Sequence, residues 1–208
     1  MNTASRPSEE ITNAATHGLG TVLAIGGTVA LIVHAASSSD PWRIVSFTVF
    51  GATMILLYAA SAVYHAMPPG RAKTTFKMID HLAIFVLIAG TYTPFTLVPL
   101  RGPVGWTVFG VIWGMAVAGI VLKIFTIGKY RKLSTLVYIV MGWTVIGAVR
   151  PLVQSVPRET LVWLAAGGLS YTFGTVFYLS KRLPYAHAVW HLFVLGGTVS
   201  HFIAVMRL

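Results

Sequence analysis

Long apolar stretches, separated by short polar or proline-containing breaks, dominate the chain. A membrane-spanning helix needs about 20 apolar residues, and runs of this kind lie near residues 14–36, 43–66, 78–99, 104–125, 133–153, 160–180 and 185–206. The breaks carry turn-forming residues, as in Pro68-Pro69-Gly70 and Arg101-Gly102-Pro103. The pattern therefore predicts an all-α, polytopic membrane protein built as a seven-transmembrane-helix bundle.

The composition agrees with this pattern. Hydrophobic residues make up 56% of the 208 residues and charged residues only 10%, with a mean hydropathy of +0.77, which does not fit an ordinary soluble domain. Seven spans and short loops use the whole length, so we expect residues 1–208 to form a single seven-helix domain. The chain has no cysteine, so any metal ion must be held by nitrogen and oxygen atoms.

Lysine and arginine favour one end of the predicted bundle. Ten of them flank the helices on the side of the amino terminus and five on the other side. Because flanking basic residues are kept on the cytoplasmic side, we predict a cytoplasmic amino terminus and an external carboxyl terminus. The net charge of +10 is then explained by topology and by anionic lipid. Nucleic acid is not an expected partner.

Four residues suited to metal chemistry lie near helix ends that this topology places on the cytoplasmic side: His65, Asp80, His187 and His191. His187 and His191 are four residues apart, so they share one helix face and can chelate an ion. Three imidazoles and a water form an open zinc arrangement in which the pKa of the water falls to about 7. Asp80 would ligate directly or accept a proton from that water. The residues thus predict a Zn²⁺ site.

Each of these residues also has a purely structural interpretation. An intramembrane histidine is often hydrogen-bonded across helices, and Asp80 could pair with Lys77 or cap its helix. Ser61, one turn before His65, could be a small packing residue. Unpaired polar groups are costly within a membrane, so the shared depth of the residues favours the metal site.

The first helix carries a second polar stripe. Glu10, Asn13 and His17 are spaced three and four residues apart and line one face. They could form an outer shell that orients a ligand imidazole. The alternative is a hydrated helix entrance.

Five segments of the chain together carry a family resemblance. They are Glu10-x-x-Asn13-x-x-Thr16-His17-Gly18-x-Gly20, Ser61-x-x-x-His65, Asp80-His81 with Gly90-Thr91-Tyr92-Thr93-Pro94-Phe95, Met141-Gly142-Trp143, and Pro184-Tyr185-x-His187-x-x-x-His191. In order and spacing, from about residue 9 to the carboxyl end, they resemble the bacterial hemolysin III family. That family belongs to the superfamily of progestin and adipoQ receptors, which is similar to the alkaline ceramidases.

The resemblance implies a multi-pass protein of the bacterial cytoplasmic (inner) membrane. It implies zinc near the cytoplasmic side, held by His65, His187 and His191, with Asp80 approaching the ion through a water and Ser61 close by. Relatives are thought to hydrolyse lipid amides such as ceramide. Some bacterial members have been connected with membrane lipid and energy homeostasis, and the family name records a haemolytic activity.

The chemistry of the residues favours a zinc-dependent hydrolase that takes a lipid amide or ester from the membrane. His65, His187 and His191 would hold the ion, Asp80 would accept a proton, and Ser61 would donate a hydrogen bond to the developing oxyanion. One alternative is a sensor or receptor-like regulator with structural zinc. The other is a pore-forming haemolysin, although a secreted pore-former must first be soluble and this composition offers no soluble form.

Overall fold

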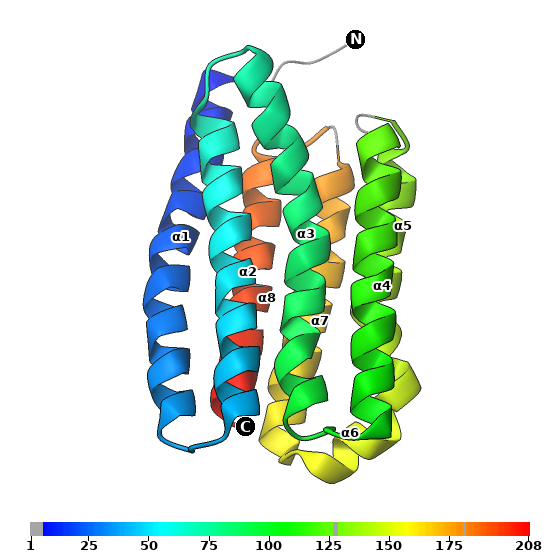
Figure 1. Ribbon diagram of the computed structural model, residues 1–208. Coiled ribbons are helices and arrows are strands. Elements are labelled where there is room, and N and C mark those ends of the chain that lie inside the picture. Colours follow the sequence, from blue (N-terminus) through cyan, green and yellow to red (C-terminus); the bar gives the residue numbers. More distant parts are fainter. Residues whose placement is uncertain (1–5, 127–128, 181) are drawn as a thin grey trace.

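The computed structural model describes residues 6–126, 129–180 and 182–208, and every regular element in these ranges is helical. The elements are α1 (Pro7–Ala36), α2 (Pro41–Ala66), α3 (Arg71–Leu97), α4 (Pro103–Thr126), α5 (Arg131–Trp143), η1 (Thr144–Ala148), α6 (Val149–Ser155), α7 (Arg158–Leu179) and α8 (Ala186–Met206). Figure 1 shows the long helices side by side, with α6 at the end of the bundle where the chain terminates.

Seven segments of the described chain are long and apolar enough to cross a membrane. Six are single helices, and α5, η1 and α6 together form the fifth span, Arg131–Ser155. The predicted seven-helix, all-α bundle is therefore confirmed. The start of α1 and the end of α8 lie at opposite ends of the bundle (Figure 1), as an odd number of spans requires. Which end faces the cytoplasm stays a prediction.

Two helices extend well beyond their apolar runs. The sequence predicted spans that begin near residues 14 and 78, whereas α1 begins at Pro7 and α3 at Arg71. A proline in the first turn and the acidic residues Glu9 and Glu10 after it suit a helix start, because proline needs no backbone donor and anions favour the positive end of the helix dipole. These added polar turns contain Glu10 of α1 and Lys73 of α3. Glu10 contacts His65 and forms an ion pair with Lys73.

The fifth span is interrupted, and a side chain from α3 compensates for the break. At η1 the α-helix is replaced by a short 3-10 helix, so the α-helical hydrogen bonds are interrupted. The Tyr92 hydroxyl donates to the Gly142 carbonyl at 2.7 Å and accepts from the Val145 N–H at 2.9 Å. Irregular backbone within a membrane is tolerated where protein groups satisfy it. Tyr92 therefore fixes the fifth span against α3.

One cluster of buried apolar side chains draws on α1, α2, α3 and α8. Phe47 and Phe50 of α2 are fully buried beside Leu31 of α1. Gly90 of α3 faces Thr53 of α2 so closely that an added Cβ would lie 2.2 Å from the Thr53 Oγ1. Small residues of this kind let membrane helices approach each other. The contact sets the spacing between two helices that both reach the histidine site.

Substituting Gly90→Ala should therefore destabilise the bundle by roughly 1–3 kcal/mol, because the methyl group must push α2 and α3 apart. The measurement is the midpoint of thermal unfolding of the purified protein in detergent. Gly114→Ala is the matched control, because nothing lies within 4 Å of a Cβ at that position and alanine favours the helix. An equal midpoint for both variants would contradict the close contact.

Candidate metal centre

Two helix ends position the three candidate ligands. His65 lies in the last turn of α2, and His187 and His191 occupy the first turns of α8. The start of α8 is tied to α1, because the backbone N–H of Tyr185 donates to the Glu9 carboxylate at 3.2 Å. The chain just before α8 thus holds the histidine pair against the beginning of the first helix.

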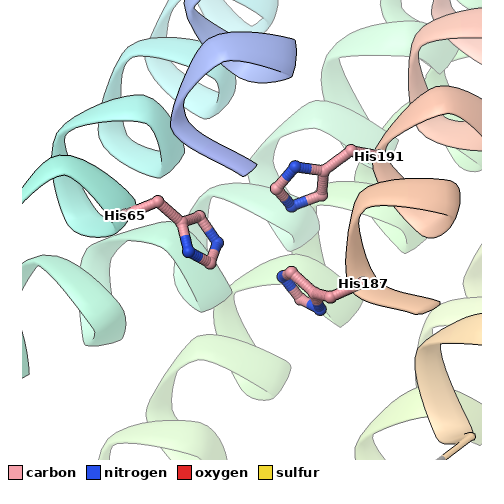
Figure 2. A group of neighbouring side chains, drawn as sticks. All are labelled: His65, His187 and His191. Atoms are coloured by element: carbon pink, nitrogen blue, oxygen red, sulfur yellow. The ribbon is translucent and has the colours of Figure 1, made fainter. Parts of the chain in front are cut away.

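The three imidazoles converge on one point. One ring nitrogen from each of His65, His187 and His191 lies within 4.8 Å of the other two, and Figure 2 shows the rings turned toward a shared space. Nitrogens bound to one tetrahedral zinc are ~3.3 Å apart, so small side-chain rotations would bring all three onto an ion. The set was expected to gather at one end of the bundle, and the structure brings it together.

His65 is oriented by an acidic residue of α1. Its Nδ1 lies 3.3 Å from Glu10 Oε2, and the Lys73 ammonium donates to the same oxygen at 2.6 Å. The Nε2 of His65 is buried and has no hydrogen-bond partner among the described residues. A histidine that donates one N–H to a carboxylate leaves its other nitrogen as a metal ligand. The residues present therefore fit a metal ion.

His191 is oriented in the same manner by a hydroxyl. Thr16 donates to the Asn13 carbonyl at 2.9 Å, so its oxygen can accept the Nδ1 proton of His191 at 3.1 Å. In this tautomer the Nε2 of His191 carries no proton and is able to ligate an ion. Thr16 was not among the predicted site residues. Its place beside His17, within the motif that carries the family resemblance, was the available signal, but no role was predicted for it.

The polar stripe of α1 lies where an outer shell would be. His17 stacks on His191 with ring centroids 3.5 Å apart and meets the Tyr58 ring edge-on at 5.1 Å. Asn13 and His17 are buried, and neither Asn13 Oδ1 nor the two His17 ring nitrogens have a hydrogen-bond partner within the described ranges. The structure thus places Glu10, Asn13 and His17 beside the three histidines.

Asp80 and Ser61 lie next to the histidines without joining the ligand cluster. Both are buried, and the Ser61 hydroxyl lies near enough to the Asp80 carboxyl to interact with it. Among the described residues, Asp80 forms no salt bridge with Lys77, although the positive charge of Lys77 acts on it from a greater distance. The ionisable group that comes within ion-pair distance of Asp80 is His81, at 3.9 Å. Asp80 thus lines the same cavity as the three histidines, although it is not one of the clustered ligands.

The site opens into a cavity of about 1030 Å³ that extends from the helix ends into the bundle. His65, His187, His191 and Asp80 all line it. Deeper in, its wall includes Leu57, Leu87, Ile88 and Val194, as well as Tyr171 and His201. Small-ligand pockets commonly measure about 300–1,000 Å³. A partly apolar cavity of this size suits a molecule with a polar end and a hydrocarbon end.

Comparison with known proteins gives consistent relatives over nearly the whole chain. The chain is 46% identical to "Hemolysin-3" of Bacillus cereus, with 95% of this chain and 90% of the relative covered. It is 48% identical to "Hemolysin-3 homolog" of Bacillus subtilis, covering 95% and 93%. It is 30% identical to the human "Monocyte to macrophage differentiation factor", covering 96% and 84%.

No solved structure matches the chain significantly. The family described as "Haemolysin-III related" matches residues 5–202. The resemblance inferred from the motifs is thereby confirmed, and so is a multi-pass membrane protein. The chain belongs to the hemolysin III family.

Proposed function

We propose that this protein is a membrane-embedded zinc hydrolase that cleaves an acyl amide or ester bond of a membrane lipid. The observation that carries the proposal is the convergence of His65, His187 and His191 on one point within a lipid-sized cavity. When bound there, zinc would supply a Lewis acid and would activate a water molecule for attack.

The residues of the chain would divide the remaining work. Glu10 and Thr16 contact the Nδ1 atoms of His65 and His191, and would thereby leave the Nε2 atoms of both rings for the ion. Asp80 would take a proton from the attacking water and return it to the leaving nitrogen or oxygen as the acyl bond breaks. The Ser61 hydroxyl, buried and without a hydrogen-bond partner of good geometry in the described chain, would donate to the oxyanion that develops on the carbonyl. The helices would keep bulk water from the reacting bond.

The metal site can be tested by the zinc content of the purified protein. Replacing both histidines, His187→Ala with His191→Ala, should abolish bound zinc, because one remaining imidazole cannot hold the ion. Metal is measured by elemental mass spectrometry. His34→Ala is the matched control, since His34 lies at the far end of the bundle against Phe47. Equal zinc in the double variant and the control would reject the site.

The orienting role of Thr16 gives a finer test. Thr16→Val removes the hydroxyl that accepts from His191 and should weaken zinc affinity by about 10–100-fold, the usual effect of losing a partner of a metal ligand. Affinity is measured by competition with a chelating dye. Thr12→Val is the control, because Thr12 lies one turn earlier on α1 and bonds only the Ser8 carbonyl in the described structure. Unchanged affinity in Thr16→Val would show that the hydroxyl does not orient the ring.

The catalytic proposal predicts chelator-sensitive release of fatty acid from ceramides, other N-acyl lipids or acyl esters. Asp80→Asn should lower the rate about 100-fold or more, the range for loss of a general base, while zinc content stays unchanged. Asp40→Asn, at the N-cap of α2 and outside the cavity lining, should leave the rate unchanged. Zinc-loaded protein that cleaves nothing across this panel would favour the sensor with structural zinc.

A lytic activity is the second candidate, because the Bacillus cereus relative is named a hemolysin. Dye release from liposomes separates the two explanations. Lysis caused by lipid cleavage would be lost in the His187→Ala, His191→Ala variant. A pore formed by the helices would release dye equally in that variant and in the unmodified protein.

A further inference from the structure

The cavity of the metal centre has a second polar wall, on the side of α3, α4 and α5. Four residues that can carry positive charge line it: Lys77 and His81 from α3, Lys123 from α4, and Arg131 from α5. We call these four residues the cationic wall. The metal chemistry proposed above assigns no role to them.

Lys123 is the residue that most needs an explanation. It is only 5% exposed, although it lies in a membrane-spanning helix. Its ammonium donates to the Ser134 hydroxyl at 2.9 Å, and none of the ion pairs of the described residues includes it. A buried charge without a counter-charge is costly, and ionisable residues within membrane spans usually mark functional sites.

The other members of the wall add to this positive charge. Lys77, Lys123 and Arg131 are all charged neighbours of His81. His81 itself donates from Nδ1 to the Lys77 carbonyl at 2.6 Å, which fixes its ring on the wall. The one carboxylate near the wall is Asp80, whose nearest basic group at ion-pair distance in the described chain is His81, at 3.9 Å.

The acidic residues on the opposite side of the cavity are engaged elsewhere. Glu10 binds Lys73 and His65, and Glu9 accepts from the Tyr185 backbone. The positive charge of Lys123 and Arg131 is therefore left for a ligand to balance.

The Tyr178 ring lies between Arg131 of the cationic wall and His187 of the metal centre. The Arg131 guanidinium carbon is 4.4 Å from the centre of the Tyr178 ring. That ring is in turn 6.1 Å from the His187 ring, centre to centre. A ligand held by Arg131 and Lys123 would thus have its adjacent atoms beside His187.

We propose that the cationic wall binds the negatively charged phosphate head group of a membrane phospholipid. Lys77, Lys123 and Arg131 lie near the ends of α3, α4 and α5, the level at which head groups meet a membrane protein. The apolar depth of the cavity, along Leu57, Leu87 and Ile88, would take hydrocarbon. If the proposed hydrolase activity holds, the bound head group would place the acyl linkages of the lipid next to the three histidines, and this last point rests on that activity.

Native mass spectrometry of the detergent-solubilised protein tests the binding directly. The probes are phosphatidylglycerol, which carries a net negative charge, and phosphatidylcholine with the same acyl chains, which does not. The unmodified protein should bind phosphatidylglycerol about tenfold or more tightly than phosphatidylcholine, the effect expected of a charge-assisted hydrogen bond. Lys123→Met should remove this preference, and Lys123→Arg should keep it.

Lys132→Met is the matched control, because Lys132 is exposed on α5 and does not line the cavity. It should keep the preference. Replacing a buried charge by an apolar side chain of similar size is usually tolerated. Should Lys123→Met fail to fold, Arg131→Gln tests the same wall. A preference retained in the folded Lys123→Met variant, or in Arg131→Gln in its place, would overturn the proposal.

Two further arms separate the alternatives. Competition by glycerol phosphate as potent as that by phosphatidylglycerol would show that the wall binds a soluble anion, and would overturn the assignment to lipid. Binding is measured with and without chelator, since it requires no turnover. Charge-selective binding by a protein that hydrolyses nothing would support the wall and reject the hydrolase. Hydrolysis by a protein that binds both lipids equally would support the hydrolase and reject the lipid site on the cationic wall.

Discussion

The absence of water from the hydrocarbon core of a bilayer is the constraint on which this structure depends. Each buried N–H, carbonyl or hydroxyl group must find a partner within the protein. The helices satisfy the backbone, and at η1 the Tyr92 hydroxyl takes over this role. In the bundle interior, Tyr58 and Tyr171 both bond the Thr198 hydroxyl, at 2.7 and 2.6 Å. Hydroxyl groups of different helices thus also pair with one another.

The candidate site is where this rule is broken. In the described chain, most buried side-chain polar atoms without a hydrogen-bond partner belong to one of the three histidines, His65, and to three other residues of the candidate site: Asn13, His17 and Ser61. Unsatisfied groups of this kind lower the stability of the folded protein. Several of them in one place therefore point to a ligand that would bond them. A bound ion, its water and a polar substrate group are the partners that such a set would satisfy. The clustering therefore supports a ligand site better than any single residue does.

Much of this arrangement could be predicted from the sequence, because two of its signals are periodic. The seven spans follow from apolar runs, and the pairing of His187 with His191 follows from their spacing of four. The meeting of His65 with that pair could be expected once the spans had placed all three at the same depth. The polar first turns of α1 and α3 could not be predicted from hydropathy, because these turns are helical without being apolar.

The orientation of side chains around helices was the other feature that the sequence did not reveal. Helix α4 is apolar on all sides, so nothing in its pattern tells which face meets the bundle. Lys123, near the end of α4, was counted only among the basic residues that predict the orientation in the membrane. In the structure it is buried and lines the cavity. Thr16 was missed for a similar reason, since its role depends on a contact with His191, 175 residues away. Such contacts depend on packing between helices and are not encoded in any local spacing.

The metal centre and the cationic wall also influence each other electrostatically. A divalent ion at the histidines would add positive charge near Arg131, which already interacts electrostatically with His187. An anion on the cationic wall would offset that charge, so each ligand would ease the binding of the other. By thermodynamic linkage this effect must be equal in both directions: zinc would raise the affinity for an anionic lipid by the same factor by which the lipid raises the affinity for zinc. A neutral lipid would gain nothing from the ion in this way, so the charge of the wall would select among lipids most strongly when the metal centre is filled.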